Sequence, residues 1–165
     1  MSDQPRYAKH PVTALAGPYG HPLHPAIVPL PIGAWVCSFL LDVASRFAAA
    51  PPWLGDASRW LIAIGVAGAL LAASVGFLDL MAIPTGTPAF RTGLLHMTCN
   101  LVATTAYVVN VALRGAGRPA LWAIVLSAVS LALVTVAGYL GGKLAYRYGV
   151  RVATEDVQSE GFRST

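Results

Sequence analysis

Four long runs of apolar residues alternate with short polar segments, and these runs predict four helices. They cover residues 26–47, 60–83, 93–113 and 119–140. Each has around 20 residues, the length that an α-helix needs to cross a hydrocarbon core of roughly 30 Å. A membrane excludes open sheets, so all four runs are expected to be helical. The pattern predicts an all-α, integral membrane four-helix bundle over residues 21–152. A polar N-terminal segment (1–20) and a disordered C-terminal tail (153–165) flank it.

Polar residues inside the third run recur at helical spacing. At 100° per residue they occupy a single arc of about 120°. Lipid disfavours such a stripe, so this face is expected to point into the bundle. For Asn100, Thr104 and Asn110 we expect hydrogen bonds between helices. The stripe consists of His96, Asn100, Thr104, Tyr107, Asn110 and Arg114.

The second run carries small residues along one face, which lets another helix approach closely. They are Gly65, Gly68, Ala72 and Gly76. Asp79 continues this face, so we expect its carboxylate to point inward and to pair with a neighbouring histidine. In the first run, Asp42 is expected to pair with Arg46, four residues further on. No internal repeat is convincing.

Three titratable residues are expected at the same depth of the bundle. His24 begins the first run in the segment "GHPLHP", Asp79 lies near the end of the second run, and His96 lies near the start of the third. Prolines crowd the first turns around His24, which predicts a rigid, partly unwound entry. The sequence therefore predicts that His24, Asp79 and His96 converge, with His21 at the entrance.

Composition agrees with a membrane location. The chain is 56% hydrophobic and 11% charged, whereas an average soluble domain is about 25% charged. This difference predicts extensive contact with the lipid bilayer. Residues 1–20 lack the apolar stretch of a secretory signal, so the first helix is the expected insertion signal. Cys37 and Cys99 are expected to be unpaired.

The distribution of cations predicts orientation. With four helices, both termini and the second connection share one side, called side A, and the first and third connections share side B. Side A carries seven of the eleven Lys and Arg residues. We therefore expect both termini in the cytoplasm, with the bundle in the inner membrane. The basic residues 143–151 are expected to reach lipid phosphates rather than nucleic acid.

The His/Asp cluster is compatible with three kinds of function. In a redox module that holds haem b or a quinone, His24 or His21 would act with His96 as axial ligands. In a transition-metal site, His21, His24, His96 and Asp79 would supply nitrogen and oxygen ligands. In a non-catalytic structural or partner-binding subunit, the cluster would only hold helices together. A membrane redox partner or a second copy of the chain fits these alternatives.

Enzyme motifs are missing from the sequence. There is no Ser-His-Asp arrangement, no Gly-rich phosphate loop and no pair of catalytic carboxylates. This argues against a classical hydrolase or kinase. Whether the chain is an enzyme stays open.

Four segments, "GHPLHP", "GFLDLMAIPTGT", "LLHMTCN" and "GGKLAYRYGVRV", occur in this order. Together they resemble the bacterial membrane family catalogued as domain of unknown function 2231, from about residue 20 to residue 152. The resemblance implies a four-helix integral membrane domain. Some relatives carry Rieske iron–sulfur or cytochrome domains, which implies membrane redox work. Members often have histidine where this chain has Tyr148; if that histidine is a ligand in those members, this chain lacks it.

Overall fold

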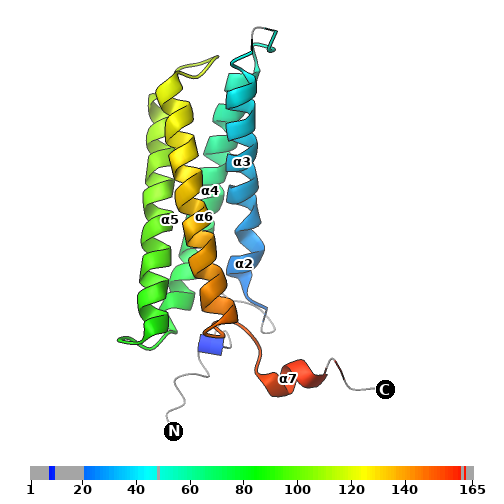
Figure 1. Ribbon diagram of the computed structural model, residues 1–165, viewed down its shortest axis with the longest axis vertical. Coiled ribbons are helices and arrows are strands. Elements are labelled where there is room, and N and C mark those ends of the chain that lie inside the picture. Colours follow the sequence, from blue (N-terminus) through cyan, green and yellow to red (C-terminus); the bar gives the residue numbers. More distant parts are fainter. Residues whose placement is uncertain (1–7, 10–20, 48, 161, 163–165) are drawn as a thin grey trace.

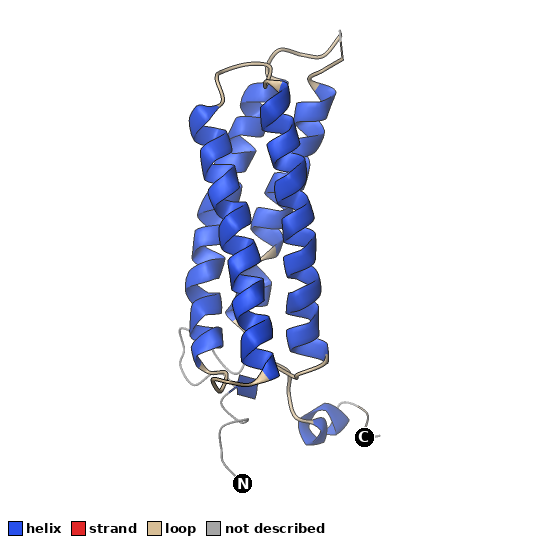
Figure 2. Ribbon diagram, turned by 60° about the vertical axis from the view of Figure 1, so that its left-hand side comes forward, coloured by secondary structure: helices blue, strands red, loops and turns tan. Residues whose placement is uncertain are grey.

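The computed structural model describes residues 8–9, 21–47, 49–160 and 162. Its long elements are α3 (Pro29–Ala44), α4 (Leu54–Met81), α5 (Pro88–Leu113) and α6 (Leu121–Tyr146), preceded by the short α2 (Leu23–Ile27) and followed by α7 (Glu155–Glu160). The long elements form an up-and-down bundle, and α2 and α7 both lie at its side A end (Figure 1). No strand occurs among the described residues (Figure 2). The predicted all-α four-helix bundle is confirmed.

The first span is interrupted near side A, as its prolines predict. Helix α2 ends at Ile27 and α3 begins at Pro29, with Val28 between them. Pro29 and Pro31 have no N–H, so they cannot donate to the carbonyl groups four residues earlier. The backbone still connects the two helices, because the Val28 N–H donates to the His24 carbonyl at 3.1 Å. His24 therefore lies in a short turn of helix that precedes the main part of the first span.

Several helix boundaries differ from those that the apolar runs predict. Helix α4 begins six residues earlier, at Leu54, and α5 begins five residues earlier, at Pro88. Helix α3 ends three residues earlier, at Ala44, and α6 continues through Gly141 and Gly142 to Tyr146. Gly141 lies inside α6 and makes room for His96: a Cβ there would lie 3.2 Å from Cε1 of His96. The expected disordered tail contains the short helix α7. The polar N-terminal segment, except for Ala8 and Lys9, lies outside the described residues.

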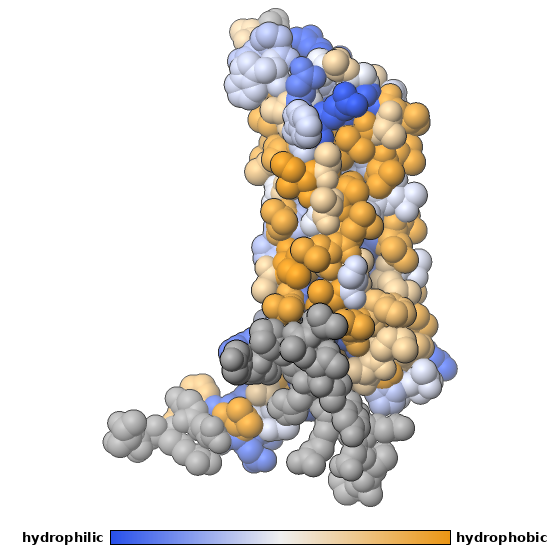
Figure 3. All heavy atoms as spheres, turned by 180° about the vertical axis from the view of Figure 1, so that it is seen from behind, coloured by the Kyte–Doolittle hydropathy of each residue, from blue (hydrophilic) through white to orange (hydrophobic). Residues whose placement is uncertain are grey.

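The bundle has an apolar exterior and a partly polar interior. Four helical segments are long and apolar enough to cross a membrane, with Leu23–Ala44 as the first of them. Apolar side chains form a broad band on the face shown in Figure 3. Several polar side chains are instead fully buried. This arrangement suits contact with a lipid bilayer, where polar groups must find partners inside the protein. The fully buried polar side chains are Ser38, Asp42, Ser58, Asn110, Ser127 and Ser130.

Close approach of α3 and α4 depends on the small residues of α4. Gly65 faces the indole of Trp35, and a Cβ at this position would lie 2.3 Å from Nε1. The indole in turn stacks on Tyr107 of α5, with ring centroids 4.2 Å apart and planes 14° apart. The predicted role of the small-residue face is confirmed. It brings two aromatic rings together at the centre of the bundle.

Candidate functional site

His24 and His96 face each other between the two halves of the bundle, as the sequence predicts. Their ring centroids are 6.1 Å apart, and the ring planes are nearly perpendicular, at 83°. His24 comes from α2 and His96 from α5, both toward side A. Both residues are half-buried. Two imidazoles thus meet inside the bundle near one end.

Each imidazole is anchored to a different helix by its Nδ1 atom. His24 Nδ1 lies 2.9 Å from the carbonyl oxygen of Ala72 in α4. His96 Nδ1 lies 2.8 Å from the carbonyl oxygen of Ala137 in α6. A carbonyl oxygen only accepts hydrogen bonds, so in both rings Nδ1 carries the proton. An imidazole that carries its only proton on Nδ1 presents Nε2 as an acceptor or metal ligand.

Glycines give both rings the space to lie against a helix. A Cβ at Gly76 would lie 2.9 Å from two atoms of the His24 ring, and Gly141 has the corresponding place beside His96. A larger residue at either position would push the ring away. Each ring therefore has one carbonyl acceptor and one glycine on the helix that supports it.

Asn100 contacts His96 from one turn further along α5. Its Nδ2 lies 3.2 Å from His96 Nε2 and donates to the His96 carbonyl at 2.9 Å. The prediction that Asn100 bonds between helices is therefore wrong, because its amide stays within its own helix. Asn100 occupies the Nε2 lone pair of His96, and a metal ion would have to take its place.

Asp79 points into the bundle as predicted, but its partner is not a histidine. Arg151 donates to Asp79 Oδ1 from Nε at 2.8 Å and from Nη2 at 2.6 Å. The side chains of Arg151 and Asp79 are only 5% and 11% exposed. We expected the basic residues 143–151 to reach lipid phosphates. For Arg151 this expectation is wrong, because its side chain is buried against Asp79. The predicted histidine partner for Asp79 is wrong because a guanidinium from outside the four spans is available.

Backbone geometry at Arg151 makes this ion pair possible. The chain turns sharply after α6, with positive φ angles at Gly149 (66°) and Arg151 (59°). A left-handed conformation is uncommon for a residue with a Cβ. The Arg151 N–H donates to the Ala8 carbonyl at 2.9 Å. The C-terminal segment, the N-terminal segment and the end of α4 are thereby joined at side A.

The remaining candidate ligands do not complete a metal site. His21 precedes α2 and is exposed. Among the described residues, no group of three or more His, Cys, Asp or Glu side chains is arranged to hold a metal ion. The predicted three-ligand set of His24, His96 and Asp79 is therefore not assembled. Cys37 and Cys99 are unpaired, as expected.

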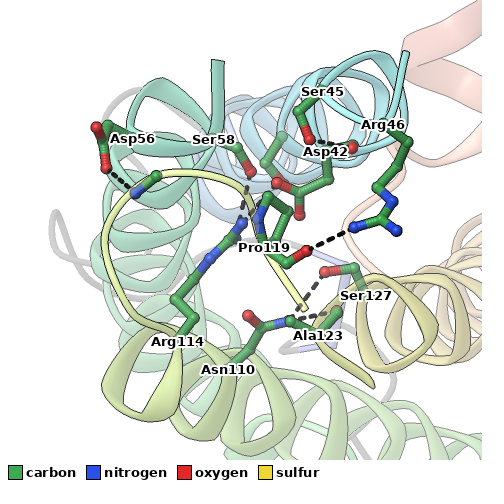
Figure 4. Close-up of polar contacts among 12 residues, drawn as sticks. Asp42, Ser45, Arg46, Asp56, Ser58, Asn110, Arg114, Pro119, Ala123 and Ser127 are labelled. Atoms are coloured by element: carbon green, nitrogen blue, oxygen red, sulfur yellow. Dashed lines mark hydrogen bonds and ion pairs between the residues drawn. The ribbon is translucent and has the colours of Figure 1, made fainter. Parts of the chain in front are cut away.

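A second polar group, the side B cluster, lies at the other end of the bundle. It comprises Asp42, Ser58, Asn110, Arg114 and Ser127 (Figure 4). Arg114 Nη2 donates to Asp42 Oδ1 at 2.6 Å, and both side chains are almost fully buried. Its Nη1 donates to Ser58 Oγ at 3.3 Å. The predicted partner of Asp42 was Arg46, which instead reaches the Pro119 carbonyl at 3.5 Å.

Hydrogen bonds from α5 to α6 extend the side B cluster. Asn110 Nδ2 donates to the Ala123 carbonyl at 2.8 Å and to Ser127 Oγ at 3.0 Å. This confirms the predicted bond between helices for Asn110. Three buried atoms, Asp42 Oδ2, Asn110 Oδ1 and Arg114 Nε, have no partner in the described structure. Sequence reasoning missed this cluster because it assigned Asp42 to a neighbour in its own helix.

The comparison with known families agrees with this architecture. The model of the family described as "Predicted membrane protein (DUF2231)" matches residues 20–154. The chain belongs to this family. The DUF2231 match covers both histidines of the facing pair and both buried ion pairs. No curated protein and no solved structure matched the chain.

Proposed function

We propose that the protein is a membrane electron-transfer module that holds one haem b between His24 and His96. The observation that carries this proposal is the pair of facing imidazoles, each with Nδ1 bound to a backbone carbonyl. Histidines that ligate a metal through Nε2 characteristically donate the other N–H in this way, which fixes the tautomer and the ring orientation. His24 and His96 would hold the haem, and the haem would carry the electron.

The number of ligands favours haem over a bare metal ion. Structural zinc sites use four protein ligands and catalytic ones use three, whereas two imidazoles suffice when a macrocycle supplies the other positions. His24 and His96, whose ring centroids lie 6.1 Å apart, would be the two residues that hold the haem iron. Asn100, whose Nδ2 lies 3.2 Å from His96 Nε2, would have to release this atom before it could hold iron.

Titration of the detergent-purified protein with haemin tests this proposal. Wild type is expected to bind one haem with the low-spin spectrum of two imidazole ligands. His24→Ala and His96→Ala should each weaken binding by more than about 10-fold and lose that spectrum. His21→Ala is the matched control, because this exposed histidine lies three residues from His24. Asn100→Ala should retain binding, because it removes only a competitor for Nε2.

Two outcomes would contradict the haem proposal. One is a wild-type protein without a low-spin haem spectrum. The other is equal haem binding by wild type, His24→Ala and His96→Ala. If the histidine variants only lower the melting temperature, the pair is structural, and the protein is a non-catalytic membrane subunit.

We further propose that side A faces the cytoplasm, so that both termini are cytoplasmic in the inner membrane. Arg114 and Arg151 are buried in ion pairs, so neither is free to meet lipid headgroups. Without them, side A still carries six of the nine remaining cations, and an excess of this kind favours a cytoplasmic location. Reporter fusions at residue 1, at residue 50 and at residue 165 test this. A periplasmic signal from either terminus would contradict the orientation.

A further inference from the structure

Three contacts across the bundle join residues that are separated by the same distance in the sequence. His24 faces His96, Trp35 stacks on Tyr107, and Asp42 pairs with Arg114 over a separation of 72 residues. The other two pairs have this separation as well. The first member of each pair belongs to α2 or α3, and the second belongs to α5 or its C-cap. Side chains of the first and third spans therefore contact each other in a constant register, with a separation of 72 residues.

The contacts made by α4 and α6 also correspond, with a different separation in the sequence. Trp35 Nε1 donates to the Ile62 carbonyl at 3.4 Å, and Tyr107 Oη donates to the Ser127 carbonyl at 3.3 Å. His24 and His96 bind the carbonyls of Ala72 and Ala137. In both cases the acceptor in α6 lies 65 residues after the acceptor in α4. Gly76 and Gly141, which make room for the two rings, have the same offset.

Burial follows the same register. In α3 the buried positions 31, 35, 38 and 42 correspond to the buried positions 103, 107, 110 and 114. In α4 the buried positions 58, 62, 65 and 72 correspond to the buried positions 123, 127, 130 and 137. Both histidines lie toward side A, so the two halves run in the same direction. The symmetry axis that relates them is therefore parallel to the helices.

We infer that the membrane domain consists of two equivalent helical hairpins, docked about a pseudo-two-fold axis, and that the Asp42–Arg114 pair specifies this docking. The hairpins are Leu23–Met81 and Pro88–Tyr146. The inner face of each hairpin therefore packs against a hairpin of similar structure. The equivalent positions 42 and 114 carry opposite charges, Asp42 in the first hairpin and Arg114 in the second. The low identity of the two halves hides the repeat in the sequence, but their contacts retain it.

Charge at the axis would exclude the competing arrangement. If the first hairpins of two chains docked on each other, two Asp42 carboxylates would meet inside the bundle without a cation between them. Two second hairpins would bring two Arg114 side chains together. An unpaired charge is costly in such a place, and such repulsion against the wrong partner is a common source of specificity. The pair therefore favours docking of the first hairpin on the second.

Exchange of the two charges tests this inference in the full-length chain. Asp42→Arg alone and Arg114→Asp alone each place like charges on the axis and should lower the melting temperature by on the order of 10 °C. The double variant D42R/R114D should recover most of this loss, because the positions are equivalent. Thermal unfolding in detergent, followed by circular dichroism, measures the three variants against wild type.

A neutral pair separates specification from stability. The double variant D42L/R114L has no charge at these two positions and is expected to fold, but it no longer excludes docking of like hairpins. Light scattering after size exclusion should show more dimer than in wild type, whereas D42R/R114D should match wild type. The inference is overturned if D42R/R114D is no more stable than the single variants. It is equally overturned if D42L/R114L has the oligomeric state of wild type.

Discussion

Replacement of Trp35 by alanine is expected to destabilise the bundle by about 3 kcal/mol, the lower end of the range for Trp→Ala in a core. The side chain is 3% exposed and fills the space between Gly65 and Tyr107. In a bilayer the lipid is as apolar as the core, so the loss comes from packing rather than from transfer out of water. Loss of the stacked ring pair accounts for about 0.5–1.5 kcal/mol of the effect.

Trp60 supplies the matched control for this measurement. It is 72% exposed, so Trp60→Ala should change the free energy of unfolding by less than about 0.5 kcal/mol. Trp35→Tyr should keep most of the wild-type stability, because it retains an aromatic ring against Tyr107. Reversible unfolding in detergent, followed by circular dichroism, compares the three variants. Similar destabilisation by Trp35→Ala and Trp60→Ala would contradict the central place of the stacked pair.

The spans and the inward faces were predictable because the bilayer constrains them strongly. Length and hydropathy alone predict four helices, and the 3.6-residue period correctly directs His96, Tyr107 and Asn110 inward. Both signals are local, so one sequence is enough to detect them. The end of α6 was not predictable in this way. Gly141 would ordinarily suggest a helix terminus, and its actual role depends on a ring from another helix.

The partners of the buried charges required information that the sequence does not carry locally. Spacing of four residues favours Asp42 with Arg46, but Arg114 reaches Asp42 across the bundle. Burial decides between them, because an arginine inside the bundle must find a carboxylate there, whereas Arg46 follows the end of α3 and is exposed. The 72-residue register of the two halves would have suggested Arg114. That register becomes evident only when the contacts are known.

The partner of Asp79 could not be predicted from local sequence either, because Arg151 lies beyond the last span. Loss of this ion pair is expected to have the second large effect on stability. Arg151→Met is expected to destabilise the protein by about 3–5 kcal/mol, because it leaves a buried carboxylate without its ion pair. Asp79→Leu should have an effect of similar size for the converse reason. The double variant D79L/R151M should lie much closer to wild type, since replacing both members of a buried pair by apolar residues is often neutral.

Arg147→Met is the matched control for the loss of a cation at side A. Arg147 is exposed and lies four residues before Arg151, so its replacement should change the free energy of unfolding by less than about 0.5 kcal/mol. Chemical unfolding of the four variants in detergent gives the coupling free energy between Asp79 and Arg151. A coupling near zero, or an Arg151→Met variant as stable as Arg147→Met, would show that the pair does not hold the C-terminal segment against α4. A large coupling would mean that the chain beyond the last span stabilises the side A end of the bundle, one helical turn from the glycine that supports His24.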